Sequence, residues 1–280
     1  PRAIRAALFD VERVEVLKGP QTTFFGNNAI AGALNITTRK PGKELAANGS
    51  ALYGSYGEYN VEAGVTVPVG DMFSVRAAGR LSGMDGYVKN AFTRKDAPHE
   101  RNRVGRISLA FTPSSNFRSD LRYDTGKTTS DDFLPFELES CPPPAPFPVG
   151  GSCANYIAAN GTAVDDKLNW RNSSRPGKLD YAFNEVGWTN ALSMGDYTLT
   201  SITGFFNHNT EYLQQLIPSP VPGIGGGSLL PVFQRETFRQ WSQEIRLASP
   251  TGGFFEWQLG GYYSSSKMRN NGVTGFFFAP

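Results

Sequence analysis

Residues 60–82, NVEAGVTVPVGDMFSVRAAGRLS, decide the fold class of this 280-residue chain. Apolar and polar side chains alternate on both sides of a turn built on Gly70 and Asp71. The apolar members of the alternation are Val61, Ala63, Val65, Val67, Phe73, Val75, Ala77 and Leu81. A period of two is typical of a β-strand that has one apolar and one polar face. The stretch therefore predicts two strands joined by a tight turn.

The same alternation recurs along the rest of the chain, at 107–111, 117–123, 241–247 and 257–263. It is noisier, but still strand-like, at 180–193 and 196–208. Tight turns at 68–72, 112–116, 193–197 and 249–254 alternate with long connections at 83–101, 126–179 and 209–234. Short turns at one end and long loops at the other are typical of bacterial outer-membrane barrels. We therefore expect an all-β fold, an antiparallel transmembrane β-barrel of which about nine strands are present. A soluble β-sandwich, such as an adhesin or carbohydrate-binding module, is the alternative.

Composition agrees with this expectation and excludes other classes. Lys and Arg number 27 against 25 Asp and Glu, which is too even a balance to favour a nucleic-acid partner. The mean hydropathy is −0.33, and no run approaches the roughly 18 apolar residues of a membrane helix. A chain of membrane-spanning strands has the same low mean hydropathy, because the apolar and polar residues of each strand alternate and their hydropathies cancel.

Nothing in the sequence favours an enzyme. The chain has no G-x-S-x-G elbow, no H-E-x-x-H pair and no phosphate-binding loop, and we expect neither a cofactor nor a metal site. The two cysteines, Cys141 and Cys153, lie in a stretch rich in Pro and Gly. Their proximity favours a loop disulfide in an oxidising compartment over two free thiols.

Residues 11–41, VERVEVLKGPQTTFFGNNAIAGALNITTRKP, carry a family resemblance. They resemble the C-terminal signature of the plug of TonB-dependent outer-membrane receptors. The matching residues are Glu12, Arg13, Glu15, Gly19, Pro20, Gly26, Gly32, Asn35, Thr38 and Pro41. Lys18 stands where the family usually has Arg, which keeps the charge but loses the bidentate fork, and Phe25 stands where Tyr is common. Further along, QEIRLASP at 243–250 and WQLGGYY at 257–263 resemble barrel strands of the same family.

The resemblance implies a barrel of roughly 22 strands with a plugged lumen. Residues 1–41 would be the end of a small α+β plug domain, and 42–280 the N-terminal part of the barrel. The implied function is active uptake of a scarce, bulky solute across the bacterial outer membrane, with a ferric siderophore or other metal chelate as the default ligand. Cobalamin, haem and saccharides are alternatives, as is a passive porin. The implied partners are outer-membrane lipid, the extracellular ligand and the TonB complex of the inner membrane, whose contact segment lies upstream of Pro1 in this interpretation. We expect no pore from these residues alone, because a sheet in lipid must close on itself.

The barrel interpretation assigns a side to each strand residue. Charges on the polar face would line the lumen, because a charge facing lipid at the midplane costs about 2–4 kcal/mol. These charges are Arg76, Arg80, Arg106, Arg118, Arg122, Glu244 and Arg246. The lipid-facing set is Val61, Val65, Val75, Leu109, Leu121, Ile245 and Leu259. We expect some of Glu12, Arg13, Glu15 and Lys18 to bridge the plug and the wall. The candidate loop contacts for a ligand are Phe133, Phe136, Phe147, Tyr156, Trp170 and Tyr212.

Overall fold

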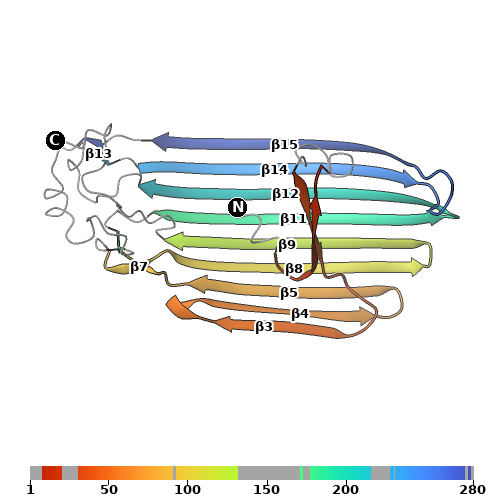
Figure 1. Ribbon diagram of the computed structural model, residues 1–280, viewed down its shortest axis with the longest axis horizontal. Coiled ribbons are helices and arrows are strands. Elements are labelled where there is room, and N and C mark those ends of the chain that lie inside the picture. Colours follow the sequence, from red (N-terminus) through yellow and green to blue (C-terminus); the bar gives the residue numbers. More distant parts are fainter. Residues whose placement is uncertain are drawn as a thin grey trace.

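A computed structural model of the chain describes residues 8–20, 31–90, 93–131, 171–172, 177–215, 228–229, 231–274 and 277–278. Within them, nine strands form one sheet in the order β15-β14-β12-β11-β9-β8-β5-β4-β3 (Figure 1). Their bounds are β3 Ala46–Tyr53, β4 Tyr59–Val69, β5 Phe73–Met84, β8 His99–Ser114, β9 Phe117–Asp131, β11 Lys178–Met194, β12 Tyr197–Gln215, β14 Pro231–Ala248 and β15 Gln258–Thr274.

Every neighbouring pair in this sheet is antiparallel, and each strand pairs with the one before it in the sheet. The expected fold class of nine antiparallel strands is confirmed. The soluble sandwich is not supported, because a sandwich divides its strands between two packed sheets. The connections β4–β5, β8–β9, β11–β12 and β14–β15 fall at the four tight turns that the sequence predicted, and the β3–β4 connection at 54–58 is a further short one at the other end of the sheet.

The long connections contain short strands that the sequence did not reveal. β6 (Val88–Asn90) and β7 (Lys95–Ala97) form an antiparallel pair within the 83–101 connection. β10 (Arg171–Asn172) pairs with β6 in parallel, and β13 (Ser228–Leu229) pairs with β16 (Phe277–Phe278). All of them lie at the end of the sheet opposite the short turns (Figure 1).

The strand register divides the side chains between two faces. One row of directly opposed residues runs from Val67 through Val75 and Leu109 to Leu121 and Trp188. We call the face that carries this row the apolar face; Val61, Val65, Ile245 and Leu259 share it. The adjacent row runs through Thr66, Arg76, Ser108, Arg122 and Gly187 on the other side, which we call the polar face. Large apolar side chains are exposed on the apolar face, among them Ile245 at 52% and Leu121 at 38%.

The alternation was noisy in β11 and β12 because the polar face carries aromatic rings there. Tyr181 and Phe183 are each 6% exposed and pack against Phe206 and His208 of β12. Gly126 on β9 makes room for them, since a Cβ at this position would lie 2.4 Å from the Phe183 ring. In these strands aromatic side chains therefore occupy polar-face positions, while Asp180 and Asn184 lie on the other face, and the period-two signal is weakened.

A separate two-stranded sheet, β1 (Val11–Lys18) and β2 (Gly32–Thr38), lies across the polar face of the large sheet (Figure 1). The sequence predicts a short buried strand from the apolar residues Val11, Val14, Val16 and Leu17. The strand is confirmed as β1, but the expected burial is wrong. Val14 is 47% and Val16 is 64% exposed, because the side of the hairpin that they occupy has no further layer among the described residues. Only a 3₁₀ turn at Ser55–Gly57 is helical in the described part of the chain, and it is too short to cross a membrane.

Candidate functional site at the junction of hairpin and sheet

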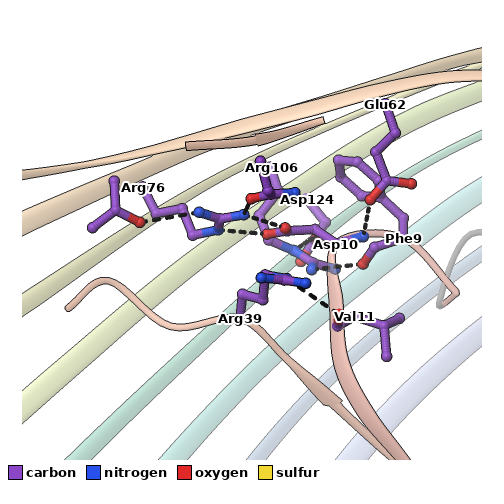
Figure 2. A network of polar contacts seen from close by, with 10 residues as sticks. Phe9, Asp10, Val11, Arg39, Glu62, Arg76, Arg106 and Asp124 are labelled. Atoms are coloured by element: carbon purple, nitrogen blue, oxygen red, sulfur yellow. Dashed lines mark hydrogen bonds and ion pairs between the residues drawn. The ribbon is translucent and has the colours of Figure 1, made fainter. Parts of the chain in front are cut away.

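The hairpin is joined to the sheet through Asp10, the residue just before β1. Asp10 is 1% exposed, and its carboxylate accepts hydrogen bonds from both Nε, at 2.8 Å, and Nη2 of Arg76 on β5. Arg76 is itself 3% exposed, so the pair is a buried, bidentate ion pair (Figure 2). Bidentate Arg–carboxylate pairs fix geometry as well as charge.

Each side-chain nitrogen of Arg76 has at least one hydrogen-bond acceptor. Its Nη1 donates to Oγ1 of Thr66 at 3.0 Å, and its Nη2 donates to Oδ1 of Asn48 at 2.6 Å. The backbone N–H of Asp10 donates to Oε1 of Glu62 at 3.0 Å. Strands β4 and β5 thus bind Asp10 directly, and β3 binds its partner Arg76 through Asn48. These hydrogen bonds offset part of the desolvation cost of burying the charge pair.

A second Arg anchors the residue before Asp10. Arg106 on β8 donates from Nη1 to the carbonyl oxygen of Phe9 at 3.0 Å and from Nε to Asp124 of β9 at 2.5 Å (Figure 2). The Phe9 ring is fully buried, with the guanidinium of Arg106 5.2 Å and that of Arg80 5.8 Å from its centroid. Both lie within the range of cation–π attraction. Arg80 also donates to the carbonyl oxygen of Leu8 at 2.8 Å.

We call Leu8, Phe9 and Asp10 with Arg76, Arg80 and Arg106 the anchor. It uses three of the Arg residues that the sequence analysis expected on the polar side of the strands. The other four expected charges share that face. Arg118 pairs with Asp120 at 2.8 Å, Arg246 pairs with Glu244 at 3.0 Å, and Arg122 lies 2.8 Å from Asp124 and also pairs with Glu185.

The residues of the 11–41 motif serve mainly the hairpin itself. Glu15 lies directly opposite Asn35 and accepts hydrogen bonds from Arg13 at 3.1 Å and Asn35 at 2.6 Å. These bonds to Arg13 and Asn35 lower the pKa of Glu15. Lys18 lies opposite Gly32, whose φ of +151° and close approach to the Leu17 carbonyl (2.5 Å from a Cβ) leave no room for a side chain. Gly19 has φ of +82°, and Pro20 follows it. Gly26 lies outside the described residues.

The expected bridges from Glu12, Arg13, Glu15 and Lys18 to the wall stay a prediction. The ion pairs that Glu12 and Glu15 make are with Arg13 of the same strand. Two ion pairs join this segment to the sheet: Asp10, just before the motif, pairs with Arg76, and Lys40, near its end, lies 3.8 Å from Asp120. Asp10 was missed because it precedes the motif and its partner is 66 residues away. The backbone hydrogen bond from the Arg39 N–H to the Asp10 carbonyl, 3.0 Å long, joins the residue after β2 to the residue before β1.

An open cleft of about 540 Å³ lies between the exit of the hairpin and the polar face of β8, β9, β11, β12 and β14. It is lined by Thr38 to Pro41 on one side and by Asp120, Arg122 and Glu185 on the other. Among the described residues no group of three His, Cys, Asp or Glu side chains could hold a metal ion. Of the expected loop contacts, Tyr212 lies on β12 and donates to Gln234, whereas Phe133, Phe136, Phe147, Tyr156 and Trp170, like Cys141 and Cys153, lie outside the described residues.

Known proteins resemble this chain in sequence and in structure. No family model matches the chain. The chain is 31% identical over 103 residues, 34% of its length, to the ferric enterobactin receptor of Pseudomonas aeruginosa, and 31% identical over 112 residues to the ferrioxamine B receptor of Salmonella typhimurium. In structure it matches the ferric yersiniabactin uptake receptor of Yersinia pestis with a TM-score of 0.72 at 17% identity, over 96% of this chain.

The chain is homologous to the TonB-dependent siderophore receptors. Its fold is that of their β-barrels, and its location is the bacterial outer membrane. It spans 13% to 15% of the two curated receptors it matches and 38% of the yersiniabactin receptor. Within a TonB-dependent receptor, the division of the chain into plug (1–41) and wall (42–280) stays a prediction. The anchor is the set of contacts that would hold those two parts together.

Gly64 provides a way to disturb the anchor without removing a charge. A Cβ at Gly64 would lie 2.5 Å from Nη2 and 3.1 Å from Cζ of Arg76. We expect Gly64→Ala to displace the guanidinium from Asp10 and to destabilise the intact protein by about 1–3 kcal/mol, the usual cost of overpacking. Gly105→Ala is the matched control, because nothing lies within 4 Å of its Cβ position. Equal thermal midpoints for the two variants would contradict the expectation.

Proposed function

We propose that the protein to which this chain belongs is a TonB-dependent receptor that takes up a ferric siderophore across the outer membrane. One observation carries the proposal: a hairpin lies across the charged face of a long antiparallel sheet and is held there by a buried Asp10–Arg76 pair. A passive porin has no use for such an anchor, since a segment fixed across its polar face would obstruct diffusion. An obstructed lumen requires work to open it, which is what an inner-membrane energy transducer supplies.

The chemistry of the polar face supports the same function. Two ion pairs lie beside the open cleft, one between Arg122 and Glu185 and one between Lys40 and Asp120. Because water can reach the cleft, it can replace contacts between the hairpin and the wall when they break, and the contacts can form again. The buried anchor differs from these pairs, because its charges cannot be separated without leaving one of them unpaired in a dry site. We infer that residues 8–10 stay attached to the wall during transport and that movement occurs elsewhere in the plug.

The ligand class rests on the relatives. The ferric enterobactin, ferrioxamine B and ferripyoverdine receptors are named for ferric chelates. Cobalamin remains the second candidate, because the vitamin B12 transporter of Photobacterium profundum is 31% identical over 99 residues of the chain.

Uptake by iron-starved cells tests this proposal. Cells expressing the intact receptor, cells lacking its gene and cells lacking TonB are supplied with a panel of radioactive ferric siderophores, and with radioactive cobalamin. We expect one ferric chelate to enter only when both the receptor and TonB are present. Entry at an undiminished rate without TonB would support the porin and contradict the proposal; TonB-dependent entry of cobalamin alone would change the ligand class.

A further inference from the structure

Uncharged polar side chains interrupt the apolar face in the middle of β9, β11, β12 and β14. They lie in two adjacent rows of directly opposed residues, and we call them the polar patch. Its members are Ser119, Asn190 and Ser201 in one row and Thr203 and Gln243 in the next. Large apolar side chains surround it, among them Trp188, which is 46% exposed, and Ile245. In β4 the corresponding part of the same face carries Val65 and Val67 instead.

The polar patch lies at the middle depth of the band that faces lipid. Along β11 the apolar face runs from Met194 through Leu192, Asn190 and Trp188 to Val186. Asn190 is four residues from each end of this run, or about 10 Å along the membrane normal for a strand tilted by about 40°. The apolar band of a membrane barrel is about 25 Å tall. Polar groups at this depth have no water to bind, so each requires a partner from protein.

Hydrogen bonds within the sheet satisfy one part of the polar patch. Thr203 donates from Oγ1 to Oε1 of Gln243 at 2.6 Å. The amide Nε2 of Gln243 donates to Oγ of Ser201 at 3.0 Å and to the carbonyl oxygen of Glu244 at 3.1 Å. Both N–H groups of Gln243 therefore have acceptors, and the side chain is fixed along the surface of the sheet.

The other part of the polar patch, centred on Asn190, is unsatisfied. The half-buried amide of Asn190 has no hydrogen bond with any residue that the structure describes. The hydroxyl groups on both sides of it act as acceptors, Ser119 from the indole N–H of Trp188 at 2.9 Å and Ser201 from Gln243. Their own O–H groups remain to be donated. This row therefore presents donors and acceptors outward, towards whatever covers the apolar face.

We propose that two copies of the receptor associate side by side in the outer membrane through the polar patch. The proposal rests on the outer-membrane barrel, because the apolar face must contact lipid, and it does not depend on which ligand is transported. An amide side chain both donates and accepts, so the Asn190 side chains of two copies can form a pair of N–H···O bonds across a twofold axis.

A second copy is the partner that matches the depth of the polar patch. Copies inserted in the same direction are related by a twofold axis along the membrane normal, so each residue meets residues at its own depth. Asn190 of one copy therefore meets the same row of the other, in which Ser119 and Ser201 also donate and accept. Small and polar side chains at a membrane interface allow both close packing and hydrogen bonding. Trp188 and Ile245 would meet apolar surface around this centre.

Association of the intact receptor in phosphatidylcholine vesicles tests the proposal. Energy transfer between donor-labelled and acceptor-labelled copies is measured while added lipid dilutes them, and we expect the transfer of the parent to follow a monomer–dimer equilibrium. Asn190→Leu should weaken association about tenfold or more, because two interfacial hydrogen bonds are lost. Its unfolding midpoint should not fall, since Leu is favourable in lipid. Val65→Leu, on the same face of β4 at a residue that is 40% exposed, is the control and should associate as the parent does.

Disulfide cross-linking shows whether the polar patch is the contact surface. Oxidation should convert Asn190→Cys to a dimer, whereas Val65→Cys should not exceed the parent, which contains Cys141 and Cys153. Equal association of the parent and Asn190→Leu would overturn the proposal, as would equal cross-linking at the two positions. A cross-link from Asn190→Cys to a different protein in cells would also overturn it.

Two further outcomes separate this proposal from the function proposed above. A receptor that is monomeric at every density but takes up a ferric chelate with TonB would overturn the dimer alone. Reaction of Asn190→Cys with a charged maleimide and not with a lipid-soluble one would overturn the dimer together with the assignment of the apolar face to lipid.

Discussion

Asp10→Ala should detach the segment before β1 from the sheet and destabilise the intact receptor by about 3–5 kcal/mol, the usual cost of leaving half of a buried ion pair. The reason is that Arg76, 3% exposed, would lose the carboxylate that accepts two of its hydrogen bonds. Thermal unfolding should show the loss, and limited proteolysis should cut near residues 8–20 earlier than in the parent. Asp10→Asn should recover part of the stability, since the amide oxygen still accepts one bond.

Glu12→Ala is the matched control for this prediction. Glu12 lies two residues away and is exposed. Its Oε1 lies 3.6 Å from Nη1 of Arg13, which is also exposed. Exposed pairs contribute about 0–1 kcal/mol, so this variant should resemble the parent. A double-mutant cycle with Arg76→Ala should give a coupling energy of at least about 2 kcal/mol between Asp10 and Arg76. Additive effects in that cycle would contradict the anchor.

The second large effect concerns the apolar face. Leu121 lies in the middle of the apolar band, opposite Leu109 on β8 and Trp188 on β11. Leu121→Arg should destabilise the receptor in a bilayer by about 2–4 kcal/mol, because a guanidinium at the lipid midplane loses its hydration. Thr189→Arg introduces the same side chain on the polar face, opposite Asp120, and should cost much less. Unfolding by denaturant in lipid vesicles measures both variants, and the opposite order would mean that the faces are exchanged.

The strands and their sides could be predicted from the sequence because alternation is local information. Val61, Val65, Leu109 and Leu121 all fall on one face, and the register requires only that consecutive strands pair. The prediction was weakest in β11 and β12, where Tyr181, Phe183 and Phe206 occupy the polar face and form a ring cluster across strands. Such a cluster depends on neighbours far along the chain, which a single strand does not reveal.

The anchor could be predicted only in part. Arg76, Arg80 and Arg106 were expected on the correct side of their strands, but the sequence gives no indication of what they bind. Phe9 and Asp10 precede the recognisable motif, and their burial depends on three Arg side chains contributed by β5 and β8. The exposure of Val14 and Val16 could not be predicted either. Apolar residues in a strand predict a buried side whether or not another layer covers that side.

The measurement that tests the account most directly is the accessibility of single cysteines placed on the two faces of β8 and β9 in the intact receptor. Cysteines at Leu109 and Leu121 should react with a lipid-soluble maleimide and resist a charged one in cells. Cysteines at Ser108 and Asp120, one residue away, should resist the lipid-soluble reagent. A shift of register by one residue would exchange the faces throughout the sheet. The reverse pattern would therefore contradict the assignment of the Asp10 anchor and the charged face to the lumen of a membrane barrel.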